Sequence, residues 1–349
     1  VAVIDIGTTS VRMAIAEIKV SGAIQILEHL SQAVNLGKDT FTRGRIHRDT
    51  IEECVQVLKS YQHILSEYGI VSAEDLRVVA TSAVRESTNR LAFLDRIYIA
   101  TGIEVDPMDE AEISRVTYLG IQSELERLGT STDTIVCEVG GGSTELLLVR
   151  DNHVQFSHTY NLGSLRLRKA VDTYNAPIVQ SRQLMESQIQ RTVELFHEHL
   201  PVGQRRNLVA LGGDMRFAAS QLIDGWNLEE GGVVSTDALE KFTNDILEMS
   251  LDKIVQRYEL RVTHQEAETL GPALLTYLCI AKHLHVSQIH ISGINLRDGL
   301  LQEMALEEAW SKEFQNQIIG SVIELGRQYE FDEAHAQQVA SLASQLFHQ

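Results

Sequence analysis

Short apolar runs alternate with longer amphipathic segments along most of the chain. The strands predicted from this pattern cover residues 1–6, 11–18, 24–34, 76–81, 134–138, 145–149, 153–160, 207–211 and 288–292. The predicted helices, in which apolar residues recur at helical spacing, cover residues 48–68, 110–127, 179–199, 236–249, 264–284 and 296–310. Strands that alternate with helices are typical of an α/β fold with parallel or mixed sheets.

The opening pattern of the chain recurs after a turn-rich break at residues 128–133. In each copy an apolar strand ends near an acid, Asp5 or Glu138, and a short polar turn leads into a second apolar strand. The turn residues are Gly7, Thr8, Thr9 and Ser10 in the first copy and Gly140, Gly141, Gly142, Ser143 and Thr144 in the second. The repeat predicts a duplicated domain, with a first unit at 1–128, a second at 129–305 and a helical segment at 306–349.

The composition of the two turns suits an anion. Tight hairpins rich in Gly, Ser and Thr expose consecutive backbone N–H groups that form an anion-binding nest. Asp5 and Glu138 would be out of place beside bare phosphate, but they suit a Mg²⁺ ion that bridges carboxylate and phosphate oxygens. One such turn is common in ordinary hairpins. Two matched copies favour a phosphate site.

The net charge of −18 restricts the partners of the chain. It counts against non-specific nucleic-acid binding, which depends on a basic surface. It would also repel a polyanionic substrate, so a phosphate site must rely on local arginines, backbone N–H groups and metal ions.

The sequence also predicts a cytoplasmic protein without a membrane segment. No apolar run reaches the roughly 18 residues of a membrane-spanning helix. Cys54, Cys137 and Cys279 lie far apart in apolar surroundings, which predicts three buried thiols in a reducing compartment.

Beyond the two hairpins, four further segments follow the order of a known family. Together they resemble the exopolyphosphatase / guanosine pentaphosphate phosphatase family, within the superfamily of actin, sugar kinases and heat-shock chaperone ATPases. The segments are 80–86 (A-T-S-A-V-R-E), 161–167 (N-L-G-S-L-R-L), 210–213 (A-L-G-G) and 293–300 (G-I-N-L-R-D-G-L).

The resemblance implies a fold and an activity. The fold would be two duplicated actin-like (ribonuclease H-like) domains with a cleft between them, and residues 306–349 would begin a further helical domain. The substrate would be inorganic polyphosphate or guanosine pentaphosphate, which would lose one terminal phosphate with the help of Mg²⁺. A homodimer is the oligomer that the family suggests.

The resemblance also assigns roles to side chains. Arg12 and Arg85 would clamp phosphate oxygens, because guanidinium groups make forked contacts with phosphate. The family's water-activating Glu opens the last helix of the first domain, and the ungapped match places Ile113 at that position. Glu112 is nearest in register and is the preferred base, whereas Glu110 is the alternative. The two acids lie about 200° apart on a helix, so both cannot face the cleft.

Other departures from the family pattern leave alternative functions open. Glu138 stands where the family has Asp, Thr9 where it has Asn, and Asp214 where it has a hydroxyl residue. An acid at position 214 would repel a nucleotide phosphate and so mildly favours polyphosphate. The alternatives to an active hydrolase are a weakened binder or sensor of polyphosphate or of guanosine tetraphosphate or pentaphosphate, and a small-molecule kinase on the same fold.

Overall fold

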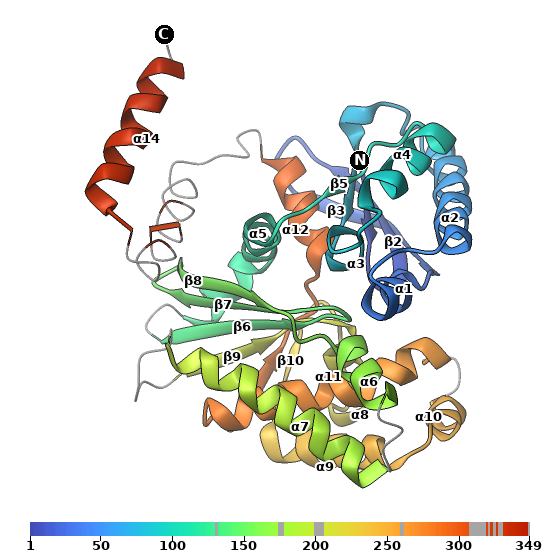
Figure 1. Cartoon of the computed structure of the whole chain (residues 1–349), viewed down its shortest axis with the longest axis vertical. Helices are drawn as coiled ribbons and strands as arrows, with labels where there is room; N and C mark the ends of the chain where they lie inside the picture. The colour runs from blue at the N-terminus through green and yellow to red at the C-terminus, as the bar shows by residue number, and fades with distance from the viewer. Residues whose placement is uncertain are drawn as a thin grey trace.

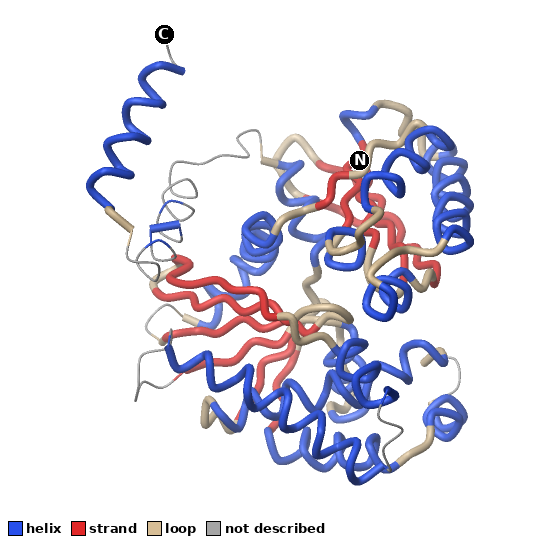
Figure 2. Tube along the Cα trace, in the orientation of Figure 1, coloured by secondary structure: helices blue, strands red, loops and turns tan. Residues whose placement is uncertain are grey.

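The computed structural model contains two sheets, each covered by helices (Figures 1 and 2). It describes residues 1–129, 132–173, 178–198, 206–258, 262–306 and 331–347, with a few isolated positions between 319 and 326. Among the described residues, no helix is long and apolar enough to cross a bilayer.

The first sheet has five strands in the order β3-β2-β1-β4-β5. β1 pairs antiparallel with β2 and parallel with β4. The strands are β1 (Ala2–Ile6), β2 (Ser10–Ile18), β3 (Ile24–Ala33), β4 (Leu76–Ala80) and β5 (Asp106–Pro107).

The second sheet has six strands in the order β10-β11-β9-β6-β7-β8. Read from the other edge, β8-β7-β6-β9-β11 repeats the order of the first sheet, and β10 is an addition. The strands are β6 (Asp133–Val139), β7 (Thr144–Arg150), β8 (His153–Tyr160), β9 (Arg206–Ala210), β10 (Gly232–Ser235) and β11 (Gln288–Ile291). The predicted duplication is therefore present in the strand order as well as in the hairpins.

Helices cover both faces of the first sheet. Side chains of β1 alternate between the faces: Ile4 packs with the core under α1–α4, whereas Val3 packs with α5 and α12. The helices are α1 (Leu36–Arg43), α2 (Arg48–Glu67), α3 (Ser82–Arg85), α4 (Arg90–Thr101), α5 (Glu110–Leu128) and α12 (Leu296–Ala305).

The largest core lies on one face of the second sheet, under the helices that lie between β8 and β11 in the chain. These helices are α6 (Ser164–Thr173), α7 (Ile178–Glu194), α8 (Gly213–Leu222), α9 (Thr236–Glu248), α10 (Leu251–Arg257) and α11 (His264–His283). Helix α11 is the most deeply buried of them and remains helical through Pro272.

Helix α5 lies between the two sheets and contributes to a core on each side. Ile113 and Val116 pack with the first sheet, whereas Ile121 and Leu125 pack with the second sheet. The single helix therefore joins the two halves through apolar contacts at its two ends.

Helix α12 returns to the first sheet after the second sheet is complete. Its Leu300 and Leu301 pack with β1, β2 and α5. The predicted second unit extends to residue 305 in the chain, but its last helix packs on the first sheet. The sequence pattern does not reveal this return.

Most differences from the predicted elements lie in short segments and at element ends. The short elements β5, β10, α1, α3, α6, α8 and α10 follow no long periodic pattern and were not predicted. The 12-residue helix α4 was not predicted either. The predicted helix 296–310 ends at Ala305 in the structure, and residues 307–310 lie outside the described residues. Of the segment 306–349, the structure describes mainly α14 (Glu333–Phe347), which has no buried residues.

Candidate active site

The two hairpins close with the same hydrogen bond. The N–H of Gly7 donates to the carbonyl of Ser10 at 3.0 Å, and the N–H of Gly140 donates to the carbonyl of Ser143 at 2.8 Å. The strand pairings correspond too, because Asp5 lies opposite Arg12 and Glu138 lies opposite Glu145. The duplicated sequence has thus folded into duplicated turn geometry.

A helix N-terminus braces each hairpin from behind. Gly37 at the start of α1 donates its N–H to the carbonyl of Thr8 at 2.8 Å, and Leu165 at the start of α6 donates to the carbonyl of Gly141 at 3.0 Å. In a trans peptide, the carbonyl of one residue and the N–H of the following residue point in opposite directions. The N–H groups of the residues that follow Thr8 and Gly141 therefore point away from the bracing helices.

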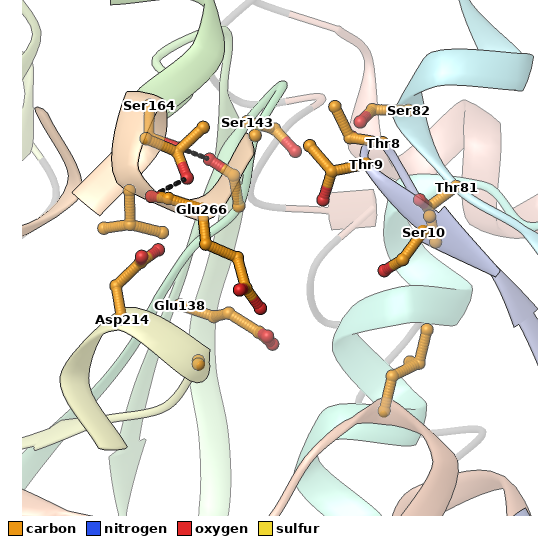
Figure 3. A pocket seen from close by; sticks show the side chains of 18 of the residues that line it. Thr8, Thr9, Ser10, Thr81, Ser82, Glu138, Ser143, Ser164, Asp214 and Glu266 are labelled. Atoms are coloured by element: carbon orange, nitrogen blue, oxygen red, sulfur yellow. Dashed lines mark hydrogen bonds between the residues drawn. The ribbon is translucent and has the colours of Figure 1, made fainter. Parts of the chain in front are cut away.

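Both hairpins line one pocket of 260 Å³ between the two sheets (Figure 3). The predicted site residues in its lining are Asp5, Gly7, Thr8, Thr9, Ser10, Arg12, Glu138, Gly140, Gly141 and Ser143. Two other predicted residues, Gly142 and Thr144, lie outside the lining. A Cβ atom at Gly142 would meet the ring of Phe41 at 2.4 Å, and Thr144 is fully buried.

The tips of the hairpins touch each other. A Cβ atom at Gly141 would lie 2.6 Å from Cγ2 of Thr8, so no larger residue fits at 141 without movement of the first hairpin. Beside this contact, Arg166 of α6 pairs with Glu86 and stacks over the ring of Phe41, 4.1 Å from its centroid. These contacts hold the two halves together at the edge of the pocket.

A buried tyrosine fixes the strand ends beneath the pocket. The hydroxyl of Tyr277 accepts the N–H of Val139 at 2.8 Å and donates to the carbonyl of Leu211 at 2.5 Å. It thereby ties the end of β6 to the turn that follows β9. This turn continues into Gly212, which has a φ of 93° and also lines the pocket.

Three carboxylates lie at the hairpin end of the pocket: Asp5, Glu138 and Glu145. Asp5 accepts a long contact of 3.4 Å from the Nη1 atom of Arg297. Burial raises the pKa of Glu138, and the positive charge of Arg216 opposes this rise. Burial and the nearby Glu138 raise the pKa of Glu145 to about 7, although the hydroxyl of Ser143 donates to its carboxylate at 2.5 Å.

The two predicted phosphate-clamping arginines have different positions. Arg12 lines the pocket, and its positive charge opposes the rise in the pKa of Glu138. Arg85 lies outside the lining and donates from Nη1 to the carbonyl of Met108 at 2.9 Å. The positive charge of Arg85 still acts on the site, because it opposes the rise in the pKa of Glu145.

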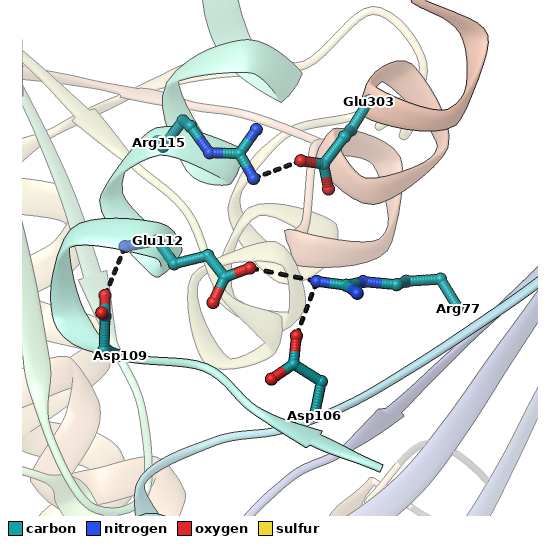
Figure 4. Close-up of polar contacts among 6 residues, drawn as sticks. All are labelled: Arg77, Asp106, Asp109, Glu112, Arg115 and Glu303. Atoms are coloured by element: carbon teal, nitrogen blue, oxygen red, sulfur yellow. Dashed lines mark hydrogen bonds and ion pairs between the residues drawn. The ribbon is translucent and has the colours of Figure 1, made fainter. Parts of the chain in front are cut away.

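Helix α5 does not bring either predicted base into the lining of the pocket. Asp109 caps the helix by accepting the N–H of Glu112 at 2.8 Å (Figure 4). Glu112 then turns away and pairs with Arg77 at 3.0 Å, whereas Glu110 is exposed outside the lining. The side chain that α5 contributes to the pocket is Ile113.

Sequence reasoning did not identify three acids of the pocket lining as site residues: Glu145, Asp214 and Glu266. The strand register could have found Glu145, since it occupies in the second hairpin the place of Arg12 in the first. Asp214 was noted only as a departure from a family pattern. Glu266 lies far from every Gly-rich turn in the sequence, so only the fold brings it to the site.

The hairpin carboxylates fit a divalent cation that is shared with a substrate. Carboxylate oxygens are the ligands that Mg²⁺ prefers, and Mg²⁺ is often bound by one or two carboxylates together with substrate phosphates and waters. Among the described residues, no group of three or more His, Cys, Asp or Glu is placed to hold a metal ion by itself. Burial raises the pKa values of Glu138 and Glu145, so a positive charge beside them would favour their ionised forms.

Known proteins share both the sequence and the fold. The chain is 26% identical over 322 residues to exopolyphosphatase 2 of Mycobacterium tuberculosis, covering 87% of this chain and 98% of that protein. It is 21% identical to the guanosine-5'-triphosphate,3'-diphosphate pyrophosphatase of Vibrio vulnificus, covering all of this chain and 67% of that one.

A solved structure extends this similarity to three dimensions. The crystal structure of an exopolyphosphatase from Cytophaga hutchinsonii covers 87% of this chain, and this chain covers 97% of it, with a TM-score of 0.76 at 21% identity. The family model of the Ppx/GppA phosphatases matches residues 14–308. The chain therefore belongs to the Ppx/GppA phosphatase family.

Proposed function

We propose that the chain is a phosphohydrolase that releases terminal orthophosphate from inorganic polyphosphate or guanosine pentaphosphate with the help of Mg²⁺. The observation that carries this proposal is the pocket, in which two hairpins of the same geometry face one space. Membership of a phosphatase family and relatives named for these two substrates support it.

The terminal phosphate would lie between the two hairpins. Backbone N–H groups of the turns donate to its oxygens, and Arg12 offers a charged donor from β2. Asp5 and Glu138 would hold the Mg²⁺ ion, which when bound neutralises phosphate charge. Phosphoryl transfer depends mainly on this kind of positioning and charge stabilisation.

Glu145 is the acid best placed to orient the attacking water. It lines the pocket, and its pKa of about 7 lies near the range that suits a general base at neutral pH. The water oxygen forms a bond to the terminal phosphorus while the bond from phosphorus to the bridging oxygen breaks. The water proton passes to the carboxylate of Glu145. The electron pair of the broken bond stays on the bridging oxygen, which leaves with the shortened substrate.

The test compares two matched variants, Glu145→Gln and Glu112→Gln, each of which removes one acid of the same size. We expect Glu145→Gln to lower kcat for Mg²⁺-dependent phosphate release by about a hundredfold or more. Glu112→Gln should keep most of the activity, because its carboxylate pairs with Arg77 outside the pocket. Loss of activity in Glu112→Gln alone would assign the base to α5 instead.

A second candidate function is binding of the same ligands without turnover. Ile113 favours it, since α5 presents an aliphatic side chain to the pocket where the family pattern has an acid. Tight binding of tripolyphosphate with no release of phosphate, measured by calorimetry and by a phosphate assay, would establish this candidate and refute the first.

A further inference from the structure

The end of the pocket away from the first hairpin is built by α8, by the first two turns of α11 and by Val262, two residues before that helix. Its wall combines an apolar bed with two carboxylates, those of Asp214 and Glu266 (Figure 3). The bed consists of Phe217, Val262 and Leu270.

Local structure fixes both acids in place. Glu266 is the third residue of α11, and its Oε2 atom accepts from the N–H and the hydroxyl of Thr263 at 2.8 and 2.9 Å. Asp214 is the second residue of α8, and the helix is preceded by Gly212, which has a positive φ. Acids are common at helix starts, where they interact favourably with the helix dipole. What distinguishes these two is that both starts face the same pocket.

The two acids interact across that space. Burial raises the pKa of Asp214 to about 7, and Glu266 is the next largest cause. Arg12 and Arg216 oppose this shift. The charge of Glu266 therefore acts on Asp214 in this part of the pocket.

The charges that line the pocket are unevenly divided. Among the described residues of the lining, one guanidinium, that of Arg12, faces five carboxylates. Three of the five lie at the hairpins, where a shared cation can balance them. Asp214 and Glu266 line the pocket beside the apolar bed, so a substrate that extended from the hairpins toward α8 and α11 would meet them.

We propose that Asp214 and Glu266 determine substrate length by repelling phosphate chains, so that the pocket accepts short phosphoanhydrides and disfavours long polyphosphate. This inference rests on the proposed function and narrows its substrate class. The pocket volume of 260 Å³, at the small end for ligand sites, agrees with a short substrate.

The experiment measures Mg²⁺-dependent phosphate release from tripolyphosphate and from long-chain polyphosphate at equal concentrations of chain ends. We expect the KM of the unmodified chain to be higher for the long substrate. Glu266→Gln and Asp214→Asn should each lower that KM by about fivefold while they change the KM for tripolyphosphate by less than twofold, because removal of one charge weakens the repulsion. Both substitutions keep the size of the side chain, and the Gln carbonyl can still accept from Thr263.

Two control variants carry the same change in net charge. Glu268→Gln lies on the same helix as Glu266, and Asp252→Asn is an exposed first-turn acid of α10; neither lines the pocket. Both should leave the KM for long chains unchanged. Equal effects in the pocket and control variants, or no effect in either, would overturn the proposal.

Salt provides a readout that a purely structural role would not move. Raising the ionic strength screens the repulsion, so the difference in KM between long and short substrates should shrink in the unmodified chain and less so in Glu266→Gln. A salt response that is the same in both proteins would contradict the proposal.

Failure of the proposed function would be distinguishable from failure of this inference. If the unmodified chain releases no phosphate from any anhydride, the hydrolase assignment fails. Calorimetric binding of tripolyphosphate and long-chain polyphosphate to the same variants then tests length selection alone. Tighter binding of the long chain by the unmodified protein would refute the inference.

Discussion

Ile113 shows how one side chain can decide what a helix offers to a pocket. It is 6% exposed, belongs to the core between α5 and the first sheet, and still lines the pocket. We expect Ile113→Glu to raise the rate of phosphate release at least tenfold above that of Ile113→Gln, because only the acid can take a proton from water.

Stability is the control for that comparison. Both variants place a polar group in a largely buried position and should lower the free energy of unfolding by about 1–3 kcal/mol. Equal rates in two variants that unfold at similar temperatures would show that position 113 does not reach the attacking water.

Glu145 links the charge of the pocket to the stability of the fold. Its carboxyl holds a proton more tightly in the folded protein, with a pKa of about 7, than at its ordinary value of 4.5. The folded state therefore binds more protons than the unfolded state between these values, so stability falls as pH rises through this window and then levels off.

Glu145→Gln removes this titration. With chelator present, we expect the variant to match the unmodified protein near pH 4.5 and to exceed its free energy of unfolding by up to roughly 3 kcal/mol above pH 7. Chemical denaturation across the pH range measures the difference. A constant offset at every pH would contradict the burial of an unbalanced acid at this site.

At the scale of elements, α5 and α12 cross with their backbones in close contact. A Cβ atom at Gly299 would lie 2.0 Å from the carbonyl oxygen of Val116, and one at Gly120 would lie 3.1 Å from the backbone of Gly299. Both helices need glycine here because their backbones touch.

Gly299→Ala should therefore lower the free energy of unfolding by about 2 kcal/mol or more, since overpacking outweighs the better helix propensity of Ala. Gly213→Ala, in α8, is the matched control, because its Cβ atom would meet nothing within 4 Å. Thermal unfolding of both variants gives the comparison, and equal melting temperatures would refute the tight crossing.

The same helix explains why part of the site escaped prediction. The pattern of residues 110–127 predicted a helix, and α5 spans Glu110–Leu128. Periodicity does not say which face of a helix meets a cleft when both of its ends pack against different sheets. The Asp109 cap is a local contact that fixes where the helix begins. The pairing of Glu112 with Arg77 helps to set the rotation of the helix, and it is a tertiary contact between distant segments.

At the scale of the whole molecule, duplication was the part that the sequence revealed best. Two strand–turn–strand units of matched composition predicted a duplicated domain, and the strand orders of the two sheets agree with it. The cleft between the two domains was implied by the family resemblance. Local sequence can show this because a hairpin is a short-range structure. The return of α12 and the arrival of Glu266 depend on contacts between distant segments, which no local pattern records.

The register of the hairpins has one more consequence. Opposite its strand-end acid, the first hairpin carries Arg12 and the second carries Glu145. The doubled unit is therefore symmetric in backbone but opposite in sign at this position. Two hairpins with identical charges would bind a tetrahedral anion equally well in two opposite orientations. Here Arg12 and Glu145 give the two hairpins different charges, so one orientation of a bound phosphate is favoured over the other.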